Sequence, residues 1–290
     1  MDPLIPGSPF KPLQPTFWRD QWYRKKLARI TSPGFESVGS YWNNRKNVNE
    51  LYVRSRTRSP WLEKMDGRLK ALHIPAGARV LDIGGGSGAL AIPLAAQGCE
   101  VTVIEPSAAM REELEKNLAS SGAGPLVVIP SRWEDVSPNE LGEPFDAVIA
   151  SYSLSMVDIG KALEKMHACC RGTVHLFWFL TPPAWERVSR DLWPCLHGRE
   201  YPGEPLADCL WQALYEMGIY ANITPEHKKT TVYRTSDEAV REYYQRLNCS
   251  TMVQEEILKE YFTHKLRPCR EGFILDGASY SAHIWGDTGA

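Results

Sequence analysis

The stretch Val80-Leu81-Asp82-Ile83-Gly84-Gly85-Gly86-Ser87-Gly88 decides the fold of this chain. Its first half is a short apolar run typical of a buried strand, and a helix is predicted directly after it, over residues 89–97. The glycines between them let the backbone turn sharply and let a ligand approach where a Cβ atom would collide. A strand that leads through a glycine-rich turn into a helix is the context of a nucleotide-binding loop.

The loop glycines alone do not identify the ligand. Gly84, Gly86 and Ala89 match the G-x-G-x-x-G/A pattern of a dinucleotide site. Asp82, however, ends the strand immediately before the loop, where its carboxylate would repel a pyrophosphate. We therefore expect a cationic, amino-bearing ligand there.

A second acid ends the next predicted strand, over residues 100–105. Glu105 follows Gly88 by 105 − 88 = 17 positions, near the offset of about 20 residues at which a ribose-binding acid is expected. A carboxylate at this place can accept hydrogen bonds from both ribose hydroxyls, which indicates nucleoside binding without choosing a cofactor.

Strands and helices alternate through the middle of the chain, with further strands predicted over 126–130, 145–150, 173–180 and 219–223. This alternation predicts an α/β, Rossmann-like, doubly wound and mostly parallel sheet with right-handed crossovers. Asp276-Gly277 suits a hairpin turn between strands at 273–275 and 279–285. Residues 61–290 form this predicted domain, with insertions at about 181–205 and 226–270.

Residues 1–60 are expected to form a separate N-terminal part. Prolines recur at every third position from Pro3 to Pro15, which favours an extended arm. Helices predicted over 17–26 and 41–54 would pack over the core as a helical cap.

Composition limits the class of protein. The 290 residues carry a net charge of −2, which gives no overall attraction to nucleic acid. No apolar run is long enough to span a membrane, and the N-terminal stretch lacks a signal pattern, so we expect a cytoplasmic protein. The seven cysteines form no C-x-x-C pair, and no metal site is predicted.

The chain resembles the class I S-adenosylmethionine-dependent methyltransferases, whose first motif is similar to Val80–Gly88. This resemblance implies a seven-stranded sheet with an antiparallel terminal strand. It also implies S-adenosylmethionine as cofactor and S-adenosylhomocysteine as product. The cofactor-binding residues that it implies are Asp82, Gly84, Gly86, Gly88, Glu105, Pro106, Arg132, Trp133, Glu134 and Ser151.

Two of these assignments have an alternative in the residues themselves. Trp133 and Arg132 can stack on an adenine, or the tryptophan can pack against the next helix. Residues proposed to face the acceptor are Tyr41, Trp42, Tyr152 and Trp178, each of which can equally fill the core. No catalytic residue is assigned, and a base is needed only if the acceptor must lose a proton. His175 and His283 are the candidates for such a base.

The predicted function is methyl transfer to a small molecule by in-line displacement. The absence of an Asn-Pro-Pro-Tyr-like sequence argues against enzymes that methylate the amino groups of bases. An RNA or protein acceptor stays open through the basic residues Arg19, Arg24, Lys25, Lys26, Arg45, Arg54, Arg56 and Arg58. A nicotinamide-dependent oxidoreductase and a non-enzymatic scaffold are the further alternatives.

Overall fold

The computed structural model describes residues 16–32, 38–45, 47–48, 67–228, 231–275, 277 and 279–288. The proline-rich arm and half of the second predicted cap helix lie outside these residues. So do Arg54, Arg56 and Arg58. Residues 67–72 are helical.

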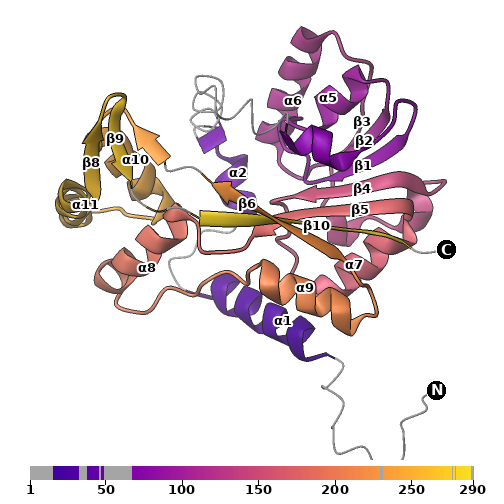
Figure 1. Ribbon diagram of the computed structural model, residues 1–290. Helices are drawn as coiled ribbons and strands as arrows, with labels where there is room; N and C mark the ends of the chain where they lie inside the picture. The colour runs from indigo at the N-terminus through magenta and orange to yellow at the C-terminus, as the bar shows by residue number, and fades with distance from the viewer. Residues whose placement is uncertain are drawn as a thin grey trace, which may run out of the picture.

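A seven-stranded sheet forms the centre of the molecule, in the order β3-β2-β1-β4-β5-β10-β6 (Figure 1). Its strands are β1 (Arg79–Ile83), β2 (Glu100–Ile104), β3 (Val127–Ile129), β4 (Phe145–Ser151), β5 (Cys170–Phe179), β6 (Asn222–Lys228) and β10 (Ser279–Asp287). The first five pair in parallel, and β10 runs antiparallel to both β5 and β6. The predicted fold class is confirmed. The strand predicted over 219–223 begins later, at Asn222.

Helices cover both faces of the sheet. On one face lie α5 (Ala91–Ala96) and α6 (Ala108–Ser121), whose Leu94 and Leu114 join the core cluster that contains Val80. The other face carries α7 (Ile159–Ala168), α9 (Ala207–Glu216) and α1 (Phe17–Ile30) (Figure 1). On this face, Leu163 of α7 and Leu210 of α9 belong to a separate core cluster, which contains Val148 of β4. The central strands β1 and β4 are buried along almost their whole length, because their side chains point alternately to two covered faces, so the sheet has an apolar layer on each side.

The first predicted cap helix exists, but it packs on a face of the sheet. Trp22 of α1 is fully buried in the cluster beneath β4 and β5, and its indole N–H donates to the carbonyl of Met156 at 2.9 Å. Glu216 of α9 accepts the backbone N–H of Trp18 at 2.9 Å, at the first turn of α1. The short helix α2 (Val38–Asn43) lies instead against α6, near the glycine-rich loop.

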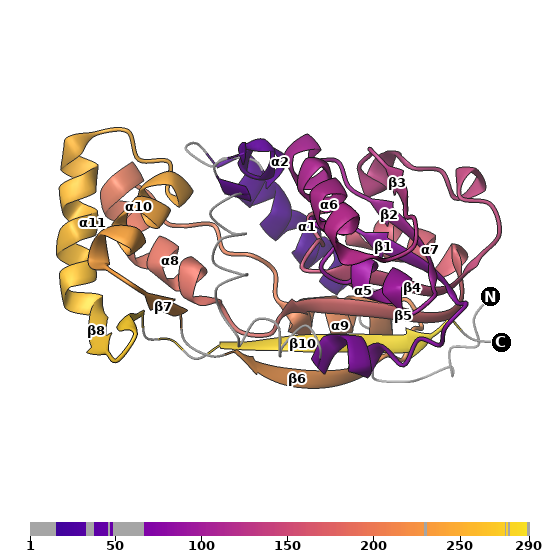
Figure 2. The same cartoon turned by 90° about the horizontal axis from the view of Figure 1, so that it is seen from above.

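The segment between β5 and β10 builds a second core beside the sheet (Figure 2). Its elements are α8 (Ala184–His197), β7 (Thr231–Tyr233), α10 (Ser236–Arg246), α11 (Met252–Lys265), β8 (Leu266–Cys269) and β9 (Gly272–Leu275). The three strands form a small sheet in the order β7-β9-β8. Thr235 caps α10, since its side chain accepts the N–H of Glu238.

The hairpin predicted around Asp276-Gly277 is wrong. Strand β9 pairs with β7 and β8, whereas β10 pairs with β5 and β6 in the main sheet. Leu275 completes the second core, while Ile284 lies in the main one, so the two strands bury their apolar residues in different places. Alternation predicted each strand but not its partner, because the pairing depends on which core each apolar face completes.

No helix in the described ranges is long and apolar enough to cross a bilayer.

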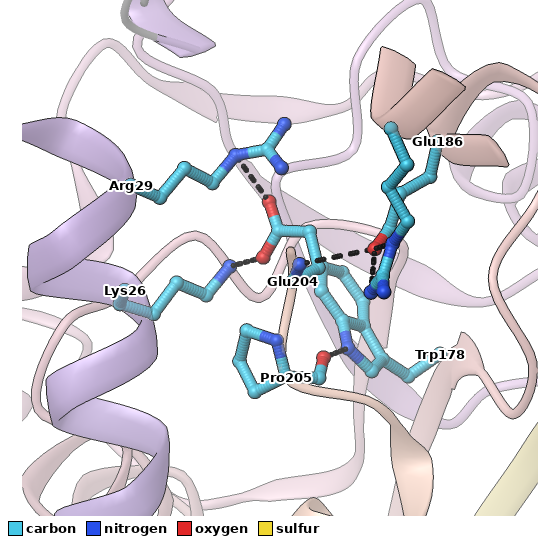
Figure 3. Close-up of polar contacts among 7 residues, drawn as sticks. Lys26, Arg29, Trp178, Glu186, Glu204 and Pro205 are labelled. Atoms are coloured by element: carbon cyan, nitrogen blue, oxygen red, sulfur yellow. Dashed lines mark hydrogen bonds and ion pairs between the residues drawn. The ribbon is translucent and has the colours of Figure 1, made fainter. Parts of the chain in front are cut away.

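A buried ionic cluster joins α1 to the segment between α8 and α9 (Figure 3). Glu204 accepts from Lys26 Nζ at 2.7 Å and from Arg29 Nε at 3.0 Å, and the three side chains are 4–8% exposed. The backbone N–H of Glu204 donates to Glu186, which also binds Arg190. Burial lowers the pKa of Lys26, and the carboxylate of Glu204 opposes that shift. The cluster thus fixes α1 to the chain that leads into α9.

Replacing Glu204 with Gln should destabilise the fold by about 3–5 kcal/mol, because two buried cations then lack their counter-charge. Urea unfolding of both proteins measures this difference. The control is Glu256→Gln, which removes an exposed partner of Lys259 and should change the free energy of unfolding by less than about 0.5 kcal/mol. Equal losses in the two variants would contradict the role assigned to the cluster.

Candidate functional site

The glycine-rich turn after β1 is shaped by close approaches that exclude side chains. Gly84 has a φ of 69°, and a Cβ atom there would lie 2.4 Å from Cβ of Ser153. A Cβ atom on Gly85 would lie 2.8 Å from Oδ2 of Asp82. Both distances are too short for any Cβ, so glycine is required at each position.

The backbone of this loop bonds within the protein. The N–H of Gly84 donates to the carbonyl at the end of β2 at 2.7 Å, and that of Gly88 donates to the Gly85 carbonyl at 3.0 Å. The N–H of Gly86 donates to Oε2 of Glu105 at 2.9 Å. A pyrophosphate site needs loop amides that point at the phosphates. Here three of them already have protein acceptors.

Asp82 lies at the end of β1, 2% exposed, on the wall of a cavity of about 180 Å³. The cavity is lined by Arg68, Asp82, Gly84, Gly85, Ala89, Leu90, Ser151 and Tyr152. The pKa of Asp82 is raised to about 7, mainly by burial and to a smaller extent by the nearby charge of Glu105. A cationic group beside Asp82 would relieve the cost of ionising it.

Glu105 follows β2 and is 6% exposed. Its two carboxylate oxygens accept the N–H groups of Ser107, at 2.8 Å, and Gly86, at 2.9 Å. Burial raises its pKa, although both of these hydrogen bonds oppose the shift. Each carboxylate oxygen can accept a second hydrogen bond, as a ribose diol would require. The neighbouring Pro106 contributes its carbonyl, which accepts from Arg111 at 2.8 Å.

The predicted adenine-side residues follow β3 and point in different directions. The Trp133 ring is 2% exposed in the core, and its indole N–H donates to the Ala162 carbonyl of α7 at 3.2 Å. Arg132 and Glu134 form an exposed ion pair with each other at 2.9 Å. Trp133 therefore packs against the next helix, α7, and its ring is not available to stack on an adenine.

The end of β4 brings Ser151 and Tyr152 to the cavity wall beside Asp82. Tyr152 has a φ of 56°, and its hydroxyl accepts a hydrogen bond from Arg68 at 2.7 Å. Sequence reasoning missed Arg68, because a single basic residue on a predicted helix normally marks a solvent-exposed face. Only the contact between that helix and the end of β4 reveals its place.

The aromatic pair of α2 connects two parts of the molecule. Trp42 packs against the cluster that contains Met110 of α6, and its carbonyl accepts from the hydroxyl of Ser107 at 2.8 Å. The Tyr41 ring lies 5.4 Å from the guanidinium carbon of Arg246, on α10. α2 therefore spans the space between the glycine-loop side and the second core.

Trp178, on β5, is buried in the core cluster that contains Trp22 of α1 and does not line the cavity beside Asp82. It is 4% exposed, its ring centroid is 5.8 Å from that of Trp22, and its N–H donates to the Pro205 carbonyl at 2.8 Å (Figure 3). The prediction that it faces the acceptor is corrected, because the side-chain alternation of β5 directs it into the core under α1.

The two histidines proposed as bases form a buried pair. His175 Nδ1 lies 3.0 Å from His283 Nε2, and the His283 ring stacks on Phe177 with centroids 4.3 Å apart. Burial lowers the pKa of His175 to about 3 and that of His283 to about 4. Both rings are therefore neutral at pH 7, and neither borders the cavity beside Asp82.

Sheet order and loop position together define the class of protein, a Rossmann-like domain with a methyltransferase-type sheet. A family model described as a methyltransferase domain matches residues 54–214, more than half of the chain. The chain belongs to this methyltransferase family, and its recognition as a class I S-adenosylmethionine-dependent methyltransferase is confirmed.

Individual relatives are more distant. An uncharacterised protein of Haemophilus influenzae is 31% identical over 160 residues, which are 53% of this chain and only 56% of that protein's length. The crystal structure of the YcgJ protein from Bacillus subtilis has 16% identity and a TM-score of 0.52, covering 78% of this chain and 97% of the other.

A methyltransferase of Geobacter sulfurreducens, solved with S-adenosylhomocysteine, has 16% identity, a TM-score of 0.48 and coverage of 78% and 90%. At 16% identity the Bacillus subtilis structure shows likeness of fold alone.

Burial of Asp82 predicts a stability effect with a definite sign. Its folded pKa, about 7, lies above the ordinary value of 3.8, so the folded protein loses stability as pH rises between these values. Asp82→Asn removes that loss. The variant should gain roughly 2–4 kcal/mol over the wild type at pH 8 and almost nothing at pH 4, measured by urea unfolding.

Asp146, at the other end of β4, provides the control of opposite sign. Hydrogen bonds from Arg171 and from the backbone of Arg79 lower its pKa. Asp146→Asn should therefore destabilise the protein at pH 8, and this effect should fade as pH falls below the ordinary aspartate range. A gain in Asp82→Asn that is the same at pH 4 and pH 8 would contradict the assigned burial of charge.

Proposed function

We propose that this chain binds S-adenosylmethionine at the cavity beside Asp82 and transfers its methyl group to a small-molecule acceptor. The cofactor assignment rests on the glycine-rich loop, whose amides are already hydrogen-bonded within the protein and which lies between two buried acids. The amides of Gly84, Gly86 and Gly88 already have acceptors, and Asp82 and Glu105 add negative charge where a pyrophosphate would lie. A phosphate-free cationic nucleoside fits this arrangement, whereas NAD does not.

The chain's own residues would hold and orient the cofactor. Asp82 would accept from the α-amino group and Glu105 from the ribose hydroxyls, while Gly84 and Gly85 let the loop pack closely against Ser153 and Asp82. Arg132, Glu134 and Pro106 stay proposed neighbours of the adenine side. When bound, S-adenosylmethionine supplies a methyl group activated on a sulfonium. The protein's contribution is then to align the acceptor for in-line displacement.

Aromatic side chains beyond the ends of β4 and β5 support a small, enclosed acceptor. Tyr152 and Phe179 have ring centroids 4.9 Å apart, and Phe179 lies 5.9 Å from Trp185 of α8. The Arg246 guanidinium contacts both Trp185 and Tyr41, so α2 and α10 approach each other there. Largely apolar surroundings with a few polar groups are typical of small-molecule sites. We propose that the acceptor lies among these rings, with Tyr41, Trp42 and Tyr152 nearest.

An RNA or protein acceptor has less support. Three of the eight basic residues that suggested it have acidic partners within the protein: Lys26 binds Glu204 in the core, Arg19 lies 3.8 Å from Glu164, and Arg45 binds Glu112. Such pairs reduce the charge available to a polyanion. We also propose a cytoplasmic location, which rests on seven cysteines that are all free thiols.

Calorimetric titration with S-adenosylhomocysteine, S-adenosylmethionine and NAD in parallel tests the cofactor. We expect both sulfur nucleosides to bind and NAD not to bind. Asp82→Ala should weaken the sulfur nucleosides by about 30-fold or more, because a charged hydrogen bond to the amino group is lost. Arg171→Met, at the far end of β5, is the matched control and should bind as the wild type does.

Binding of NAD alone would overturn the methyltransferase proposal and favour the oxidoreductase alternative. Binding of none of the three compounds would contradict the cofactor assignment and favour a scaffold.

A further inference from the structure

Two opposite charges face the same cavity at the end of the sheet. Among the described residues that line it, Asp82 and Arg68 are the acid and the base, and the other six are glycine, alanine, leucine, serine and tyrosine. Arg68 is 7% exposed, so its charge lies within the protein and not on the surface. A buried guanidinium needs anionic or hydrogen-bonding partners to compensate for lost solvation.

The surroundings of Arg68 hold its side chain against the cavity wall. One Nη atom donates to the Tyr152 hydroxyl at 2.7 Å, and Nε lies 3.5 Å from a carboxylate oxygen of Glu226. The guanidinium carbon lies 4.7 Å from the Tyr152 ring centroid and 5.4 Å from that of Phe177. A guanidinium presents five N–H donors in a planar fork, which lets it keep structural partners while binding a carboxylate.

An α-amino acid group matches this pair of charges. Its ammonium and its carboxylate leave the same carbon atom, so a complementary site needs an anion and a cation within one small cavity. The cavity of about 180 Å³ has Asp82 for the first and Arg68 for the second.

We propose that Arg68 binds the α-carboxylate of the cofactor's amino-acid end, while the Tyr152 hydroxyl accepts a hydrogen bond from the guanidinium and holds it in position. This inference rests on the proposed function, because it takes S-adenosylmethionine as the ligand. It assigns to Tyr152 a role toward the cofactor in addition to its place near the acceptor. It also explains why an arginine and a tyrosine from distant parts of the chain meet at the end of β4.

The test compares S-adenosylhomocysteine with its decarboxylated form, which keeps the amino group and lacks the carboxylate. Both are titrated calorimetrically into the wild-type protein, Arg68→Met, Arg68→Gln and Tyr152→Phe. The wild type should prefer the carboxylate form by about 10- to 100-fold, which corresponds to one charge-assisted hydrogen-bonded pair. Arg68→Met and Arg68→Gln should lose most of this preference, and Tyr152→Phe should lose a smaller part of it.

The decarboxylated ligand reports whether each variant still folds, because its affinity should stay close to that of the wild type. Arg68→Gln keeps a donor for Tyr152, so it preserves local packing if Arg68→Met does not fold. Arg171→Met again controls for the loss of one positive charge and should keep the full preference.

Three results would overturn the inference, and they are distinguishable. If the wild type binds both ligands equally, or if the Arg68 variants keep the preference, Arg68 does not bind the carboxylate, and the cofactor assignment is unaffected. If the wild type binds neither ligand, the proposed cofactor itself fails and this inference fails with it.

Discussion

The site depends on the burial of two carboxylates next to each other at the ends of β1 and β2. Strands β1 and β2 pair in parallel and in register, so the residues at their ends come out at the same edge of the sheet. Burial raises the pKa of both carboxyls, and the nearby charge of Glu105 adds to the cost of ionising Asp82. Such an arrangement lowers the stability of the free protein. A ligand that brings positive charge and hydroxyl donors restores that stability when it binds.

The rest of the fold supports that edge. The glycine-rich loop follows the first acid and donates one amide to the second, which fixes the loop's shape without a ligand. α2 binds Ser107, two residues after Glu105, and reaches Arg246 of the second core through Tyr41. That second core combines α8, which follows β5, with the segment between β6 and β10, two strands that pair directly in the main sheet. Both parts extend outward from the sheet without changing its strand order.

Local patterns in the sequence predicted what local physics decides. The positions of the glycines, Asp82 and Glu105 could be predicted because a strand–turn–helix places them by chain geometry alone. Arg68, the direction of Trp133 and Trp178, and the partner of β9 could not be found in this way. Each depends on which distant segment packs against it, and alternation along one strand does not contain that information.

The most direct test of the account is the proton balance of cofactor binding. S-adenosylhomocysteine is titrated calorimetrically at pH 7 in buffers that differ in their enthalpy of ionisation. Asp82 has a pKa of about 7 in the free protein, so about half of it is protonated there. If Asp82 receives the α-amino group, binding must ionise it and release about half a proton per site. Heats that do not depend on the buffer, or that indicate proton uptake, would contradict the account.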